Sequence, residues 1–165
     1  KFPTSEHYTR GKGYQEFQML DQWVATLPPQ IDKFTKISGR YIFKNIKSLI
    51  EEHFSGVVID IHWKHRVVHT SLFSCDVAFY IRTIHSLYQL VDDSQNRWIE
   101  KVLYEELTQK KYRYQTQVFA QDPLIKVKLG SSESVYDKSQ LNWKHYVRNC
   151  ERMLFRKLHI NQIYL

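Results

Sequence analysis

The most regular pattern along the chain is an alternation of apolar and polar residues that begins after Phe54. Apolar side chains recur at every second position, at Val57, Ile59, Ile61 and Trp63. A period of two is that of a β-strand, whose successive side chains point to opposite faces. The same alternation returns from Cys75 to Thr83, and a shorter apolar segment follows from Leu87 to Val91. We therefore predict three consecutive strands, a β-meander.

Helical spacing of apolar residues marks three further segments. An amphipathic helix is predicted from Tyr14 to Leu27, and Pro28-Pro29 ends it. A second helix of about four turns is predicted after Asp92-Asp93-Ser94, whose side chains are suited to a helix start. Its apolar stripe consists of Trp98, Ile99, Val102, Leu103 and Leu107. A third helix is predicted from Gln140 to Met153.

The remaining segments suggest a fold class. Strand-like stretches cover Tyr112 to Phe119, Leu124 to Leu129 and Phe155 to Leu165, and residues 41–52 fit either a short helix or a strand with a turn. The order of three strands, a helix and two strands matches the five-stranded OB barrel. We therefore predict an α+β, mostly β fold: a five-stranded OB-like barrel with a helix between strands 3 and 4 and additional terminal helices. Other α+β sheets share this order.

The expected domain organisation is simple. Residues 1–13 are polar around a Gly-Lys-Gly turn signal and are predicted to be a flexible arm, and residues 14–165 a single OB-like domain. The chain begins with lysine rather than methionine, so we expect it to be part of a longer protein. It has no apolar run of the ~18 residues that a membrane span needs and no signal-peptide stretch at its start.

Charge and aromatic content narrow the class of partner. The 165 residues include 24 Lys and Arg against 17 Asp and Glu, a formal net charge of +7, and this excess attracts polyanions. Aromatic residues make up 15% of the chain, with 11 tyrosines, and rings interleaved with cations can stack bases while holding phosphates. The two cysteines, Cys75 and Cys150, have neither disulfide-framework nor zinc-cluster spacing. We expect a soluble domain in a reducing compartment, with no membrane partner.

Several short motifs resemble the OB folds of telomere end-binding proteins. The segment Phe34–Ser38 precedes the strand motif Phe54–Ile61, and Cys75–Arg82 resembles the second strand of that family. The stretch Leu87–Ser94 is similar to one in the small RPA-like subunit of the telomere-capping trimer. The closing residues Arg156–Leu165 resemble the last barrel strand.

This resemblance implies a non-catalytic domain that binds single-stranded DNA and protects telomeric ends in the nucleus. The implied partners are the G-rich telomeric overhang and other subunits of a telomere-capping complex. The alternative is a protein-interaction OB domain that forms a homodimer or assembles subunits of a telomere complex. In that case the amphipathic helices at 14–27 and 140–153 would present their apolar faces to a partner.

The candidate binding residues follow from the same fold. In an OB fold, outward side chains of the first two strands and of the loop between them line the oligonucleotide track. The matching residues are His62, Lys64, Arg66, Tyr80 and Arg82. A second cluster after the central helix consists of Tyr112, Arg113 and Tyr114. The alternative is a solvated surface without a ligand, and the preceding lysines would also suit a helix C-terminus.

Metal and catalytic chemistry have weaker patterns. The run of Asp60, His62, His65 and His69 suggests a metal, but the last two histidines are expected in a loop, and no cysteine joins them. No nucleophile triad, phosphate-binding glycine loop or zinc-protease motif is present. We therefore predict no metal, no cofactor and no enzyme activity. A metal-dependent nuclease is the third function considered, after the DNA-binding and protein-interaction domains.

Overall fold

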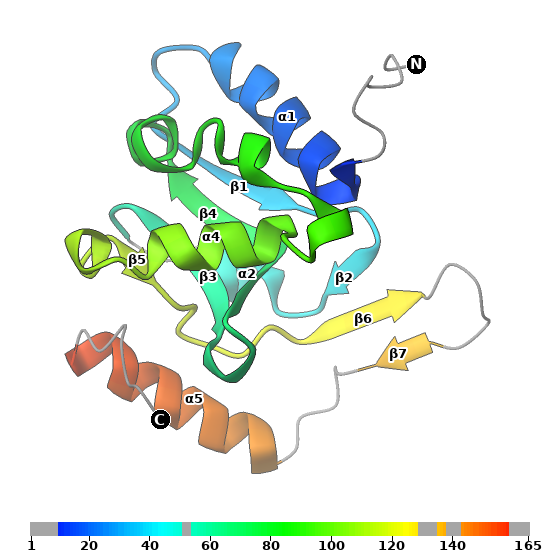
Figure 1. Ribbon diagram of the computed structural model, residues 1–165. Coiled ribbons are helices and arrows are strands. Elements are labelled where there is room, and N and C mark those ends of the chain that lie inside the picture. The colour runs from blue at the N-terminus through cyan, green and yellow to red at the C-terminus, as the bar shows by residue number, and fades with distance from the viewer. Residues whose placement is uncertain (1–9, 51–53, 129–134, 138–142, 159–165) are drawn as a thin grey trace.

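A four-stranded mixed sheet forms the centre of the protein. The computed structural model describes residues 10–50, 54–128, 135–137 and 143–158 (Figure 1). In spatial order the strands are β1 (Lys33–Ile37), β4 (Val67–Asp76), β3 (Val57–His62) and β5 (Thr116–Gln117). Neighbours pair antiparallel except β5, which runs parallel to β3. The predicted strand after Phe54 is confirmed as β3.

A second, smaller sheet lies beside the first. Its strands, all antiparallel, are β2 (Tyr41–Phe43), β6 (Ile125–Lys128) and β7 (Val135–Asp137). The strands in the described ranges therefore form two separate sheets and close no barrel. Helical residues also outnumber strand residues in those ranges, so the expectation of a mostly β fold is wrong, whereas the combination of helices and a sheet is confirmed.

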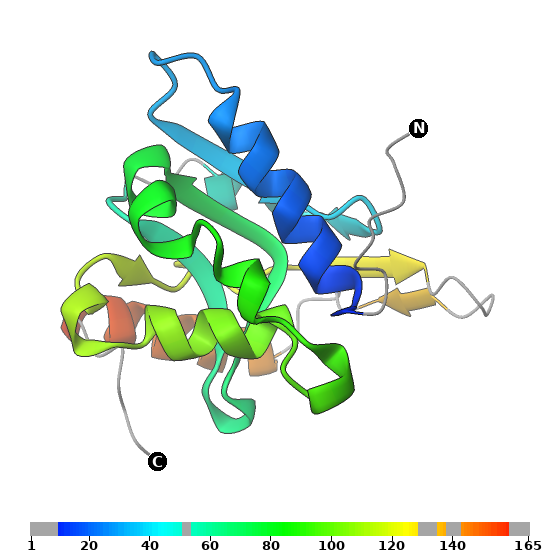
Figure 2. The same ribbon diagram turned by 45° about the horizontal axis from the view of Figure 1, so that its top comes forward.

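Strand β3 is buried on both faces. Successive strand side chains point to opposite sides, and accordingly Val57 and Ile59 join one hydrophobic cluster while Val58 joins another. The larger cluster includes residues from α1 (Lys12–Ala25) and α4 (Ile99–Leu107), which lie over the same face of the sheet (Figures 1 and 2). The smaller cluster includes Leu49 from α2 (Ile46–Ile50). The start of the strand therefore has no outward, solvated face.

The segment predicted as the second strand is helical. Strand β4 ends at Asp76, and the chain continues through α3 (Val77–Phe79) and the π-helical turn η3 (Tyr80–Ile84). The buried residues here are Phe79, Tyr80, Thr83 and Ile84, a helical spacing, whereas Ile81 is 56% exposed. A short apolar run fits both periods, and burial against α1 and α4 selects the helix. The third predicted strand is likewise a 3-10 helix, η4 (Leu87–Leu90).

The helix predictions agree better with the structure. Both α1 and α4 lie where predicted, although α4 is shorter than four turns. Asp92 caps a separate 3-10 turn, η5 (Asp93–Gln95), by accepting the Ser94 amide at 3.0 Å. The last helix, α5 (Trp143–Leu158), extends into the segment predicted as a closing strand, so that prediction is wrong for residues 155–158. Residues 159–165 and 1–9 lie outside the described ranges, and α1 begins inside the predicted flexible arm.

Candidate nucleic-acid interface

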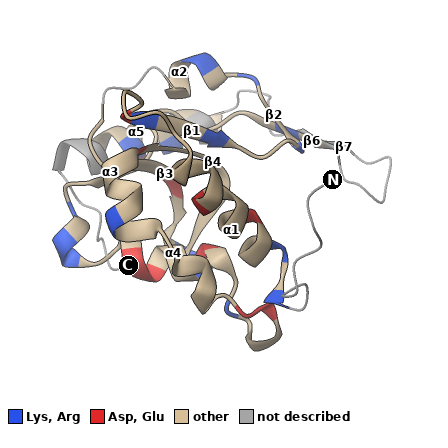
Figure 3. Ribbon diagram, turned by 90° about the horizontal axis from the view of Figure 1, so that it is seen from above, with Lys and Arg blue, Asp and Glu red and all other residues tan. Residues whose placement is uncertain are grey.

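Two distant segments meet to form a cluster of cations and rings, which we call the basic–aromatic patch. It consists of Arg82 from η3 and of Lys110, Lys111, Tyr112, Arg113 and Tyr114 from η6 (Lys110–Tyr112) and the residues after it. The Arg82 guanidinium donates a hydrogen bond to the Gln115 side chain at 3.4 Å. The Phe79 and Tyr112 rings meet edge to face with centroids 5.7 Å apart. Figure 3 shows blue Lys and Arg segments on the α3 side of the molecule.

The backbone of the patch is fixed at both ends. Helix α4 ends at the fully buried Leu107, and the Thr116 hydroxyl donates to the Leu107 carbonyl at 3.1 Å. The Val57 amide of β3 donates to the Gln115 carbonyl at 2.7 Å. The loop from α4 to β5 is therefore held against the sheet, and it presents Tyr114 with 67% of its surface exposed.

A glycine makes this close approach possible. Gly56 has a φ of +90°, a conformation that side-chain-bearing residues rarely adopt. A Cβ atom at this position would lie 2.1 Å from the Gln115 carbonyl oxygen. Position 56 therefore lets β5 run beside β3, which sets the place of the loop that follows η6.

The charged groups of the patch lie close to its rings. The Lys111 ammonium is 4.5 Å from the Tyr112 ring centroid, and the Arg113 guanidinium is 5.9 Å from that of Tyr114. Hydrogen bonding to Tyr112, together with Glu106 at 3.3 Å, raises the pKa of Lys111. Cations beside exposed rings can hold phosphates while the rings stack on bases.

Tyr80 does not belong to this surface. It is completely buried, and its hydroxyl donates to the Asp21 carboxylate of α1 at 2.7 Å. Burial, followed by the hydrogen bond to Asp21, raises the pKa of Tyr80 well above its usual range. The second Asp21 oxygen accepts the Ser86 amide at 2.8 Å. The prediction of an outward Tyr80 is therefore wrong: the tyrosine fastens η3 to α1.

The predicted residues of the first loop lie elsewhere. His62, Lys64 and Arg66 are exposed at the tip of the β3–β4 hairpin, in and around the turn η2 (Trp63–His65). In both Figures 1 and 2 this tip and the turn after α4 lie at different edges of the molecule. Desolvation, and then repulsion from His65 and His69, lowers the pKa of His62. Of the eight predicted residues, the fold thus gathers four in the patch and three at the hairpin tip, and it buries Tyr80.

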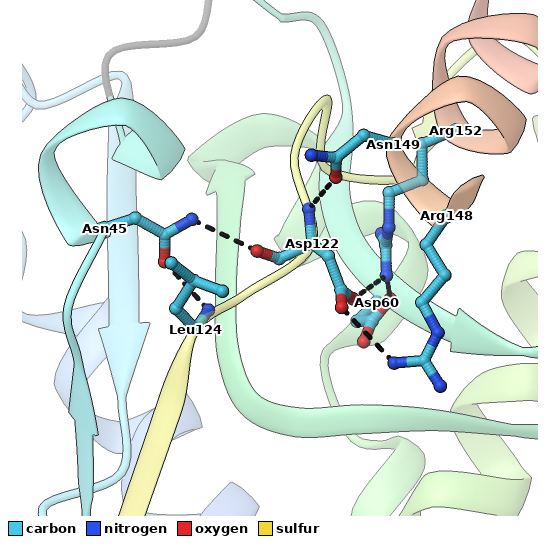
Figure 4. Close-up of polar contacts among 7 residues, drawn as sticks. All are labelled: Asn45, Asp60, Asp122, Leu124, Arg148, Asn149 and Arg152. Carbon is cyan, nitrogen blue, oxygen red and sulfur yellow. Dashed lines mark hydrogen bonds and ion pairs between the residues drawn. The ribbon is translucent and has the colours of Figure 1, made fainter. Parts of the chain in front are cut away.

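A pocket of about 280 Å³ lies between this hairpin and α5. Its central contacts join Arg152 to both Asp60 and Asp122, while Arg148 contacts Asp122 at 3.3 Å (Figure 4). The Asn149 side chain also accepts the Asp122 amide at 2.7 Å. These acidic and basic groups neutralise one another, so the cluster seats α5 on the sheet.

Sequence reasoning missed this cluster because nothing in the local pattern links its members. Asp60 and Arg152 are 92 positions apart. The available signal was weak: three polar residues, Arg148, Asn149 and Arg152, recur at helical spacing on one side of α5.

The described residues do not gather a metal site. Asp60 is engaged by Arg152, and the His62 and His65 rings stack with centroids 4.4 Å apart. Across the described ranges, no group of three or more His, Cys, Asp and Glu side chains could hold a metal ion. In the same ranges, no helix combines the length and apolarity that crossing a bilayer requires.

Comparisons with protein-family models, with curated proteins and with solved structures find no match to this chain.

Proposed function

We propose that this protein is a non-catalytic domain that binds single-stranded nucleic acid on the basic–aromatic patch. The observation that supports this function most is the convergence of Arg82 with the Lys110–Tyr114 loop. Arg82 and the rings and cations of residues 110–114 come from two separate parts of the sequence. The contact between Arg82 and Gln115 brings them together. The net charge of +7 adds long-range attraction for a polyanion.

The chemistry of the patch favours single strands over duplexes. An exposed tyrosine such as Tyr114 can stack only on a base whose face is free, as in an unpaired strand. The flanking Arg113 and Arg82 can contact phosphates on either side of that base. We predict that the strand follows the line from η3 to the turn after α4. That the bound strand is the G-rich telomeric overhang remains a prediction from the sequence resemblance.

The test is fluorescence anisotropy with labelled oligonucleotides at several salt concentrations. We expect single strands to bind more tightly than a duplex of the same sequence, with an affinity that falls steeply as salt rises, because each phosphate contact releases counterions. Comparing a G-rich repeat with a pyrimidine strand tests the telomeric preference.

Two tyrosines of nearly equal exposure provide a matched pair of variants. Tyr114→Ala should weaken binding by about 1–3 kcal/mol, the contribution of one stacked base. Tyr146→Ala on α5, where the tyrosine is 65% exposed against 67% for Tyr114, should leave the binding of a short oligonucleotide to dilute protein unchanged. Equal losses for the two variants, or binding insensitive to salt, would refute the patch. A third variant, Lys64→Ala, tests the tip of the β3–β4 hairpin. If only this variant loses nucleic-acid binding, the interface lies at the hairpin tip instead.

A further inference from the structure

Helix α5 is attached to the domain by its polar side. Arg152 and Arg148 contact Asp60 and Asp122, and Asn149 accepts the Asp122 amide (Figure 4). A surface helix of a globular protein usually buries its apolar side and exposes its polar one. The orientation of α5 is the reverse, which leaves its apolar side facing solvent.

The exposed apolar residues of α5 form one continuous stripe, which we call the α5 stripe. It consists of Trp143, Tyr146, Val147, Cys150, Met153 and Leu154. Their spacing of three and four residues is the heptad pattern of a helix that packs against another helix. The exposed fraction ranges from 46% for Val147 to 70% for Trp143, so no described part of the chain covers the stripe.

Five of the six members of the stripe are placed symmetrically about Cys150, and only Trp143, seven positions before it, has no apolar counterpart. Tyr146 and Val147 precede Cys150 by four and three positions, and Met153 and Leu154 follow it by three and four. If two such helices pack antiparallel about a two-fold axis at Cys150, each of these apolar residues faces another apolar residue. A two-fold interface requires this kind of self-complementarity. We propose that the α5 stripe is the interface of a homodimer, in which α5 packs antiparallel against α5 of a second copy.

The position of Arg152 on α5 is compatible with this partner. Arg152, with 13% of its side chain exposed, lies on the side of the helix away from the stripe and pairs with Asp60 and Asp122 of its own domain. Packing of α5 against α5 of a second copy therefore does not bring unneutralised guanidinium groups of Arg152 into the interface. Two domains of net charge +7 still repel each other at long range. Salt screens this repulsion, so the dimer should become tighter as salt rises, opposite to nucleic-acid binding.

The exposed area predicts a weak dimer. At their exposed fractions the two aromatic and three aliphatic side chains offer roughly 500 Å² of apolar surface on each copy, given the size of aromatic residues. Two copies would then bury about 1,000 Å², which is the low end of specific interfaces. We therefore expect a concentration-dependent equilibrium between monomer and dimer.

Sedimentation velocity from low micromolar to submillimolar protein tests this equilibrium. Met153→Glu places a charge in the stripe and should give a monomer throughout, with an unchanged melting temperature. Met19→Glu on α1 is the matched control, because Met19 is 46% exposed against 51% for Met153, and it should dimerise like the wild type. A wild-type monomer at every concentration would overturn the proposal and leave the stripe to another protein or a lipid surface. Equal dimerisation of the two variants would overturn it as well.

Cysteine cross-linking tests the position of the two-fold axis. Diamide accepts the two protons and two electrons that a pair of Cys150 thiols loses on forming a disulfide. The wild type should give a covalent dimer on a non-reducing gel, and Cys150→Ser should not, since Cys75 is completely buried. The covalent dimer should also disappear in Met153→Glu. A cross-link that persists in Cys150→Ser, or none in a protein that sediments as a dimer, would overturn the antiparallel arrangement about Cys150.

Discussion

The first and last helices of this protein are both amphipathic, yet they attach to the domain in opposite ways. Helix α1 buries Tyr14, Phe17 and Val24 in the main hydrophobic cluster. Helix α5 attaches through Arg152 and its neighbours and leaves its apolar stripe exposed. The amphipathic pattern alone predicts that a helix has an apolar side, but it does not predict which side contacts the domain.

The difference depends on the groups that each helix meets on the domain. Helix α1 faces the aromatic side of the sheet, where Phe17 stacks near Phe73 at 6.1 Å between ring centroids. Its one buried acid, Asp21, is satisfied by Tyr80 and Ser86. Helix α5 instead faces two carboxylates, those of Asp60 and Asp122, which require cations when they are removed from water. The buried Asp122 and the partly buried Asp60 thus select the polar side of α5.

The largest expected effect contrasts tyrosines on the two helices. Tyr14 on α1 is 4% exposed, and Tyr146 on α5 is 65% exposed. Tyr14→Ala should lower the free energy of unfolding by about 4 kcal/mol, because it leaves a cavity in the core. Tyr146→Ala should change it by less than about 0.5 kcal/mol. Urea unfolding of dilute protein, followed by circular dichroism, measures both. Similar losses would mean that the apolar side of α5 is covered.

A somewhat smaller effect is expected from removing the cation that seats α5. Arg152→Met leaves Asp60 and Asp122 without their shared partner and should cost about 3 kcal/mol, as for other broken buried ion pairs. Arg148→Met is the control, because that side chain is 45% exposed, and its loss should cost about 1 kcal/mol or less. Amide hydrogen exchange would show whether the protection lost in Arg152→Met is confined to α5. Uniform loss across α1 and α5 would contradict a local role.

The smallest effect concerns the dependence of stability on pH. The pKa of His62 is lowered by desolvation and by His65 and His69, so the unfolded chain takes up this proton more readily than the folded one. Stability should therefore fall as pH decreases from about 7 to 5, the range around and below the ordinary histidine pKa. His62→Gln should reduce that fall, as measured by urea midpoints at both pH values. Parallel pH profiles would exclude this contribution of His62.

The success of sequence reasoning differed with the length and regularity of each pattern. Helix α1, with its long helical pattern, and strand β3, with its strict alternation, were predicted correctly as elements, but the solvated outward face expected along β3 is absent at its start. The segment around Tyr80 was not, because its few apolar residues fit a strand as well as a helix. Strand β4 was predicted too late in the sequence, because its apolar and polar residues do not alternate regularly. This irregularity accompanies a shift in its register with β3 between Ile59 and Asp60.

The candidate site was predictable only in part. Local alternation of cations and rings marked Tyr112, Arg113 and Tyr114, and the structure places them together. Their meeting with Arg82 depends on the path of α4 across the sheet, which no local pattern encodes. The selection of Tyr80 was wrong because an acid on another helix, Asp21, binds its hydroxyl in the core.

One position without any binding chemistry has a consequence for the patch. At Gly56 a single hydrogen atom fills the space that faces the Gln115 carbonyl, and any larger group would push that carbonyl away. The loop bearing Tyr114 would then move relative to Arg82, although neither residue had changed. Gly56 thus sets the spacing between the Tyr114 ring and the Arg82 cation. A ligand need never contact this glycine, yet the glycine limits the length of nucleic acid that the surface could accommodate.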